Sequence, residues 1–93
     1  MVMQRDRSWL SLDQPAVQAV AATDPVLVLP LGAVEQHGPH LPLGTDAMIV
    51  EGLLAAALQR LEQPQRVYTL PPLAVGVSPE HASFPGTVSL SAA

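Results

Sequence analysis

The sequence predicts an α/β fold built on a mainly parallel sheet. Residues 26–29 are a short apolar run rich in β-branched side chains, residues 66–70 have the pattern of a second strand, and a segment with the periodicity of an amphipathic helix, residues 47–62, lies between them. This strand–helix–strand order is typical of parallel strands joined by a crossover. A chain of 93 residues is short for a sheet covered on both faces, so we expect residues 1–93 to be the N-terminal part of a single larger domain.

The composition is that of a soluble globular protein, with 48% hydrophobic residues, 13% charged residues and a net charge of −4. No apolar run approaches the roughly 20 residues of a membrane-spanning helix. Four arginines without lysine are too few to neutralise the several phosphates that nucleic-acid binding requires. The polar segment 1–9 does not resemble a secretory signal. We therefore expect a cytoplasmic protein that binds neither nucleic acid nor membranes, and because cysteine is absent, any metal ligands are histidines and carboxylates.

The first half of the chain contains a helix and a strand. Asp13 can cap the free N–H groups of a helix over residues 14–22, and Pro15 is tolerated in the first turn of that helix. The sequence Thr-Asp-Pro at 23–25 ends the helix. Residues 26–29 are a continuous run of valine and leucine, which is typical of a strand buried on both faces.

The second half begins with the crossover helix. Thr45 and Asp46 form a capping sequence before a helix over residues 47–62, whose apolar side chains gather on one stripe that we expect to pack on the sheet. The stripe consists of Val50, Leu53, Leu54, Ala57, Leu58 and Leu61. The strand at 66–70 follows and ends at two prolines, and residues 87–90 begin a further element.

The loop after the first strand concentrates the side chains that carry chemistry. Residues 30–45 are rich in glycine and proline, and loops at the carboxyl ends of parallel strands are where open α/β sheets place their sites. Glu35 and His37 are two positions apart, so in an extended segment they point to one side. The turns that follow allow Asp46 to reach the same point, where its carboxylate can bridge two cations. Taken singly, Asp46 also fits a helix cap and His40 a surface residue.

Two stretches of the sequence resemble the creatininase (creatinine amidohydrolase) family. Residues 31–46, LGAVEQHGPHLPLGTD, resemble the family's first signature, and residues 76–90, GVSPEHASFPGTVSL, resemble its second motif. Both occur in the family's order and approximate spacing. The resemblance implies a three-layer α/β/α fold, of which this chain holds the N-terminal portion, and a dinuclear metal site that hydrolyses an amide-type C–N bond.

The resemblance also assigns metal ligands to individual residues. Glu35 resembles the ligand of one metal ion, His37 the ligand of the other, and Asp46 the carboxylate that bridges the two. The implied cofactors are two divalent ions, Zn²⁺ and/or Mn²⁺. The family's remaining ligands, a histidine in a glycine-rich motif and a later glutamate, lie beyond residue 93.

Other residues of the two motifs receive supporting roles. His40 lies within the first signature, and we expect it to brace the loop rather than to bind metal. Ser78 and His81 fall where the family's second loop approaches the active site, which implies contact with substrate. A hydrogen-bonded pair of Glu80 and His81 within the loop is the alternative.

The resemblance implies that the complete protein is a metal-dependent amidohydrolase. Open catalytic zinc sites usually hold about three protein ligands each, so we expect the 93-residue chain alone to be inactive. The alternative is a catalytically incomplete fragment that acts only as a packing or weak metal-binding module. The substrate is a small-molecule or peptide amide, with cyclic amides, amidine-like compounds, a formamide of pyrimidine metabolism and the peptide precursor of mycofactocin all open. The family also implies a homo-oligomer, a hexamer.

Overall fold

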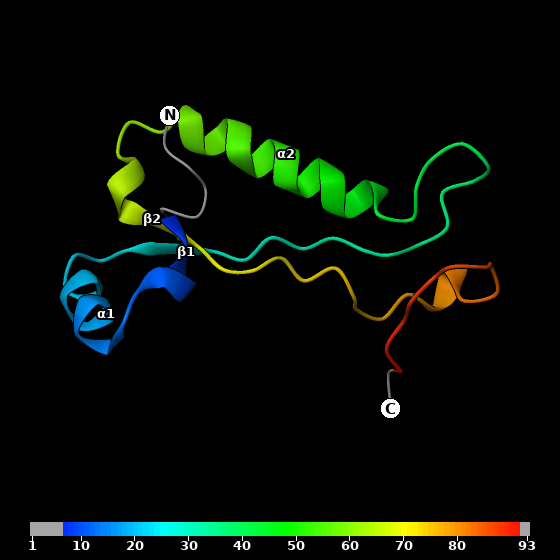
Figure 1. Ribbon diagram of the computed structural model, residues 1–93, viewed down its shortest axis with the longest axis horizontal. Coiled ribbons are helices and arrows are strands. Elements are labelled where there is room, and N and C mark those ends of the chain that lie inside the picture. The colour runs from blue at the N-terminus through cyan, green and yellow to red at the C-terminus, as the bar shows by residue number, and fades with distance from the viewer. Residues whose placement is uncertain (1–6, 92–93) are drawn as a thin grey trace. The chain divides into compact units, whose positions relative to one another are not determined.

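The computed structural model describes residues 7–91 (Figure 1). The chain forms two compact units. The first unit comprises residues 7–30 and 53–71, and the second comprises residues 31–52 and 72–91. In the described range, no helix combines the length and the apolar character needed to cross a membrane. Most of segment 1–9, on which the prediction of no secretory signal rests, lies outside the described residues.

Helix α1 (Gln14–Ala21) forms where the sequence predicts it. The Asp13 Oδ1 atom accepts a hydrogen bond of 3.0 Å from the backbone N–H three residues later. Pro15 occupies the first turn, where its missing N–H costs no helical hydrogen bond. The Thr23 hydroxyl donates to the Val20 carbonyl at 2.6 Å and so satisfies one of the carbonyls at the helix end. The helix stops one residue before its predicted end.

Strands β1 (Val26–Val28) and β2 (Val67–Thr69) pair in parallel, which confirms the predicted strand arrangement (Figure 1). The first residue after β2 donates its N–H to the last carbonyl of β1 at 2.9 Å. Both strands are shorter than the predicted 26–29 and 66–70. Pro30 and Pro71 follow closely, and because proline has no N–H to donate, the regular ladder does not continue through them.

The segment at residues 7–9 lies beside β2, which the sequence did not predict. Ser8 forms a parallel bridge with Thr69, and the Arg7 Nε atom donates to a β2 carbonyl at 3.0 Å. The Arg7 guanidinium lies 4.5 Å from the centre of the Tyr68 ring, and the Trp9 ring meets the same tyrosine edge-on with centroids 5.6 Å apart. Cation–π and edge-to-face contacts of this kind hold the segment to the strand.

Strand β1 is not buried on both faces, so that prediction is wrong. The side chains of Val26 and Leu27 remain 51% and 45% exposed. A two-stranded sheet gives each face few neighbours, and three or more strands or a packed helix are needed to bury one. Within residues 7–91, no leucine, isoleucine, valine, methionine or aromatic side chain is buried, whereas the hydroxyl side chain of Thr69 on β2 is.

Helix α2 (Thr45–Gln59) begins and ends earlier than predicted. Thr45 and Asp46, expected as the cap, form the first turn, because the Met48 N–H already bonds to the Gly44 carbonyl at 2.9 Å. The helix ends where the Arg60 N–H turns to the carbonyl three residues back. Three of the six residues in the predicted apolar stripe are half-buried and three are exposed. The half-buried members are Val50, Leu54 and Leu58, and the exposed ones are Leu53, Ala57 and Leu61.

The rest of the second unit consists of two loops that follow the strands in sequence. Leu31 and Leu73 form a parallel bridge between the loops. The segment 87–90, predicted to begin a further element, is neither helix nor strand. Its backbone donates single hydrogen bonds to two different partners, Val34 and Gly76, at 3.0 and 2.8 Å. No continuous ladder can therefore form along it.

Candidate metal centre

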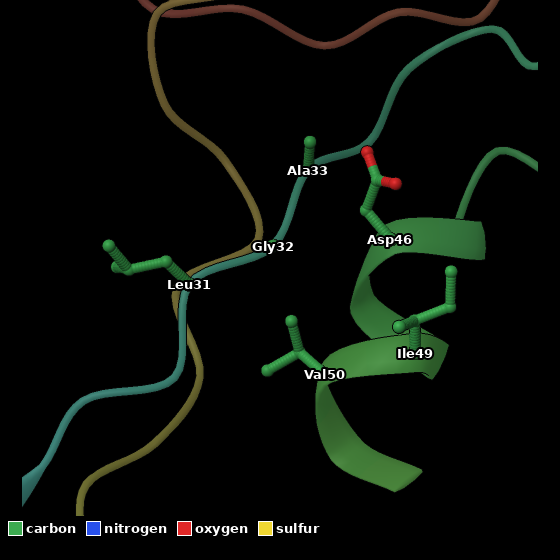
Figure 2. Close-up of a pocket in the computed structure, with 6 residues that line it drawn as sticks. All are labelled: Leu31, Gly32, Ala33, Asp46, Ile49 and Val50. Carbon is green, nitrogen blue, oxygen red and sulfur yellow. The ribbon is translucent and has the colours of Figure 1, made fainter. Parts of the chain in front are cut away.

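The first loop packs directly on the first turn of α2. A Cβ atom placed on Gly32 would lie 3.0 Å from the Ala47 Cα, so a side chain there would require the helix backbone to move by a few tenths of an ångström. The loop and the helix line an open pocket of about 350 Å³, into which the helix presents Asp46 (Figure 2). Figure 2 shows the Asp46 carboxylate on the side of the pocket that Ala33 lines. The close approach at Gly32 therefore sets where this carboxylate stands.

His37 reaches Asp46 from the loop. Its Nε2 atom lies 3.2 Å from the Asp46 Oδ1 atom, and its Nδ1 atom lies 3.0 Å from the Glu35 carbonyl oxygen. Because a carbonyl can only accept, Nδ1 carries a proton and donates it. The hydrogen bond to the Glu35 carbonyl, and then the negative charge of Asp46, raise the pKa of His37 above its usual 6.5, although partial burial opposes the shift.

The pair of His37 and Asp46 fits a divalent cation. A histidine that donates one N–H to a backbone carbonyl has the orientation typical of a metal-bound imidazole, with the other nitrogen free to bind. Two ligands of one tetrahedral zinc ion with bonds of about 2.0–2.1 Å lie about 3.3 Å apart. In the metal-free chain the 3.2 Å between Nε2 and Oδ1 is a hydrogen-bonded ion pair, and a cation that displaced the shared proton would find the two atoms close to that spacing.

The Glu35 carboxylate meets the second loop. Its Oε2 atom lies 3.9 Å from the His81 Nε2 atom, and its side chain is only 13% exposed. Ligand atoms of Glu35, Glu80 and His81 all lie within 4.8 Å of one another, so these three residues form a cluster that could hold a metal ion. His37 and Asp46 are not members of that cluster. The structure thus pairs His37 with Asp46 and places the Glu35 carboxylate with the second loop.

Gln36 connects the two loops, a role that the sequence analysis did not assign to it. Its backbone N–H donates to the Thr87 hydroxyl at 3.1 Å, and its side-chain Nε2 lies 3.3 Å from the His81 Nδ1. The sequence indicates Glu80 only as a hydrogen-bonding partner of His81. A signal for Glu80 was present, since it stands next to His81 in the second motif.

The remaining predicted residues take defined places. Ser78 is buried, at 6% exposure, and its backbone N–H donates to the Ser89 hydroxyl at 2.8 Å. Ser78 precedes the 3₁₀ turn Pro79–His81, which carries His81. His40 is exposed in the turn that an antiparallel bridge between His37 and Leu41 closes. Contact of Ser78 and His81 with substrate stays a prediction.

A family model described as creatinine amidohydrolase matches residues 11–93. The chain belongs to the creatininase family. A solved structure of a mutant creatininase superposes on 91% of the chain with a TM-score of 0.69 and 32% identity, and the match covers 34% of that structure. This likeness and the parallel strands with their helices confirm the predicted α/β class as a partial fold of the family.

Curated relatives in the creatininase family carry two names, both of hydrolases. The mycofactocin precursor peptide peptidase of Mycolicibacterium smegmatis is 42% identical over 71 residues, 74% of this chain and 29% of the relative. That of Mycobacterium ulcerans is 47% identical over 76 residues, 76% of this chain and 30% of the relative. The creatinine amidohydrolase of Pseudomonas putida is 38% identical over 79 residues, 80% of this chain and 29% of the relative. The chain thus spans less than a third of the length of these relatives.

We expect the raised pKa of His37 to be measurable in the metal-free chain. A raised folded-state pKa contributes stability that is complete below pH 6.5 and is lost as the pH rises through the folded-state value. Zn²⁺ must displace the proton on Nε2, so its affinity should rise over the same pH range. An NMR titration of the His37 ring checks the pKa, and Asp46→Asn should lower it because the substitution removes the negative charge. An unchanged His37 titration in Asp46→Asn would contradict the pairing.

Proposed function

We propose that this chain supplies part of the dinuclear metal site of a creatininase-family amidohydrolase. Glu35 would hold one divalent cation and His37 the other, with the Asp46 carboxylate shared between them, and Zn²⁺ or Mn²⁺ would be the ions. The observation that carries the proposal is the His37–Asp46 pair, in which Nε2 stands 3.2 Å from Oδ1 while Nδ1 donates to a carbonyl. That donor set and spacing suit a cation.

The reaction is hydrolysis of an amide-type C–N bond. Bound divalent cations of this kind lower the pKa of a water molecule and polarise a carbonyl group. The chain's own contribution is orientation. The Glu35 carbonyl keeps the His37 ring in one tautomer, and the first turn of α2 presents the Asp46 carboxylate to the pocket beside Gly32. Fixing the ring and the carboxylate in this way reduces the rearrangement needed to receive an ion.

The substrate we propose is a peptide amide bond of the mycofactocin precursor class, with a cyclic amide such as creatinine as the second candidate. The peptide is favoured because the two peptidases are 42% and 47% identical to this chain, against 38% for the creatinine amidohydrolase. Three ligand residues are too few for two catalytic ions. The complete site therefore needs donors outside this chain, and the isolated chain is inactive. The non-catalytic alternative is a fragment that binds metal weakly and hydrolyses nothing.

A chimera tests the proposal. The matched segment of the Mycolicibacterium smegmatis peptidase is replaced by the corresponding residues of this chain, and hydrolysis of the precursor peptide and of creatinine is measured with Zn²⁺ or Mn²⁺ present. We expect metal-dependent cleavage of the peptide, loss of that cleavage in the same chimera carrying His37→Ala, and no turnover by the isolated chain.

The remaining outcomes of the chimera experiment distinguish the catalytic proposal from its alternatives. A folded chimera that binds both ions and hydrolyses neither compound would contradict the catalytic proposal and support the non-catalytic fragment. Cleavage of creatinine alone would select the second substrate. Two Zn²⁺ ions bound tightly by the isolated chain would show that the count of three ligand residues is wrong.

A further inference from the structure

The side chain of Gln36 has a fixed direction. Its Oε1 atom accepts the Gly38 N–H at 3.0 Å, and a backbone N–H can only donate. The amide therefore places its NH₂ group toward the second loop, where Nε2 lies 3.3 Å from the His81 Nδ1. The positive φ of 76° at Gly38 makes the tight turn that brings this N–H back to the Gln36 side chain.

This direction fixes the tautomer of His81. Because the Gln36 NH₂ group can only donate, the His81 Nδ1 atom accepts and carries no proton. The proton of the neutral ring is then on Nε2, the atom that lies 3.9 Å from the Glu35 Oε2. That separation is longer than a hydrogen bond, but such contacts are often long in a metal-free or substrate-free site and tighten when it is loaded.

The backbone around His81 holds the ring in place. The His81 N–H bonds to the Ser78 carbonyl at 3.3 Å within the 3₁₀ turn, and Ser78 is itself tied to the Ser89 hydroxyl. On the other side, the Gln36 N–H bonds to the Thr87 hydroxyl at 3.1 Å. The Ser78–Ser89 bond holds the turn that carries His81, and the Gln36–Thr87 bond holds the residue next to Glu35.

We propose that His81 is a positioning residue for Glu35: Gln36 locks its tautomer, and its Nε2–H holds one carboxylate oxygen so that the other faces the metal. The inference rests on the proposed function, because it takes Glu35 as a metal ligand. Gln36 takes up the Nδ1 atom, and the Nε2 atom faces the Glu35 carboxylate, so this role of His81 is an alternative to the predicted contact of His81 with substrate. The cluster of Glu35, Glu80 and His81 is in consequence a support for a ligand and not a third cation site.

The tautomer is tested on the metal-free 93-residue chain. Long-range ¹⁵N-edited NMR of the neutral histidine rings reports which nitrogen carries the proton. We expect the Nε2–H form for His81 in the parent chain and a mixture of the two forms in Gln36→Leu. An Nδ1–H form in the parent chain, or a His81 spectrum that Gln36→Leu leaves unchanged, would show that Gln36 does not set the tautomer of His81.

The positioning role is tested by Zn²⁺ titration calorimetry on the same chain. His81→Leu should raise the Zn²⁺ Kd about tenfold, the lower end of the range for residues that orient a ligand. His81→Gln should restore the Kd to within about twofold of the parent, because its amide offers an N–H to Glu35, and Glu80→Gln should leave it unchanged.

The calorimetry separates failure of the inference from failure of the proposed function. Glu80→Gln weakening Zn²⁺ as much as His81→Leu would mean that the cluster binds the cation itself and would overturn the positioning role. A His81→Leu chain with the parent Kd would overturn it too. If the parent chain does not bind Zn²⁺, or binds it in a way that His37→Ala does not weaken, the proposed metal site is refuted, and the positioning role falls with it.

Discussion

Asp46→Asn is expected to weaken Zn²⁺ binding by about 100-fold or more, since loss of a direct ligand should reach at least the upper end of the range for residues that only orient ligands. The substitution keeps the size of the side chain but removes the charge that pairs with His37 and the oxygen that would bridge the two ions. Calorimetric titration of Zn²⁺ into the chain measures the change, and in the chimera the same substitution should abolish hydrolysis.

His40→Ala is the matched control for Asp46→Asn. His40 is also a polar residue of the first signature, but it is exposed in the turn after His37. The Zn²⁺ Kd should stay within about twofold of the parent value, because surface substitutions away from special features have small effects. Equal losses in the two variants would count against Asp46 as the shared ligand.

Gly32→Ala is expected to destabilise the second unit by about 1–3 kcal/mol, the usual cost of forcing an extra methyl group into a packed contact. The added Cβ would stand 3.0 Å from the Ala47 Cα and 3.2 Å from the Ala47 nitrogen, both backbone atoms that can move only with the helix. The first turn of α2 must shift, and Asp46 shifts with it. Zn²⁺ affinity should therefore fall although no ligand is changed.

Gly52→Ala gives the matched control on the same helix. A Cβ at Gly52 has no atom within 4 Å, so alanine should stabilise the helix by about 0.5–1 kcal/mol through its higher helix propensity. Urea titration followed by circular dichroism at 222 nm compares the two variants, and calorimetry compares their Zn²⁺ affinity. A Gly32→Ala chain as stable as Gly52→Ala, with the parent Zn²⁺ affinity, would show that the close approach does not position Asp46.

Local features of the fold were predictable because local chemistry determines them. Asp13 and Pro15 specify the start of α1, and the two strand segments on either side of the crossover helix specify parallel strands. The residues of the two motifs, with their order and approximate spacing, predict the family that the family model confirms. The sequence argument expects Glu35, His37 and Asp46 to meet at one point, and the turns at glycine and proline bring His37 to Asp46 over only nine residues, whereas the Glu35 carboxylate lies against the second loop. Their role as metal ligands stays a prediction.

Features that depend on distant contacts were not predictable. The Tyr68 ring contacts Arg7 and Trp9, which lie about 60 residues earlier in the chain, and no periodicity in the sequence predicts that contact. The predicted burial of β1 failed because exposure depends on what covers a strand and not on the apolar character of the strand itself. The link from Gln36 to His81 spans 45 residues and joins two loops, where side-chain direction follows no fixed period.

The two residue pairs of the proposed centre differ in how far apart their members are in the sequence, so they are completed at different times during synthesis of the chain. His37 and Asp46 are nine residues apart, whereas Gln36 and His81 are 45 apart. At ribosomal rates of about 5–20 residues per second, the imidazole and its aspartate are synthesised roughly 2–7 s before the second motif emerges. A cation in the cell can thus meet the nascent polypeptide at this early pair first, and Glu35 receives its support only after the second motif has left the exit tunnel.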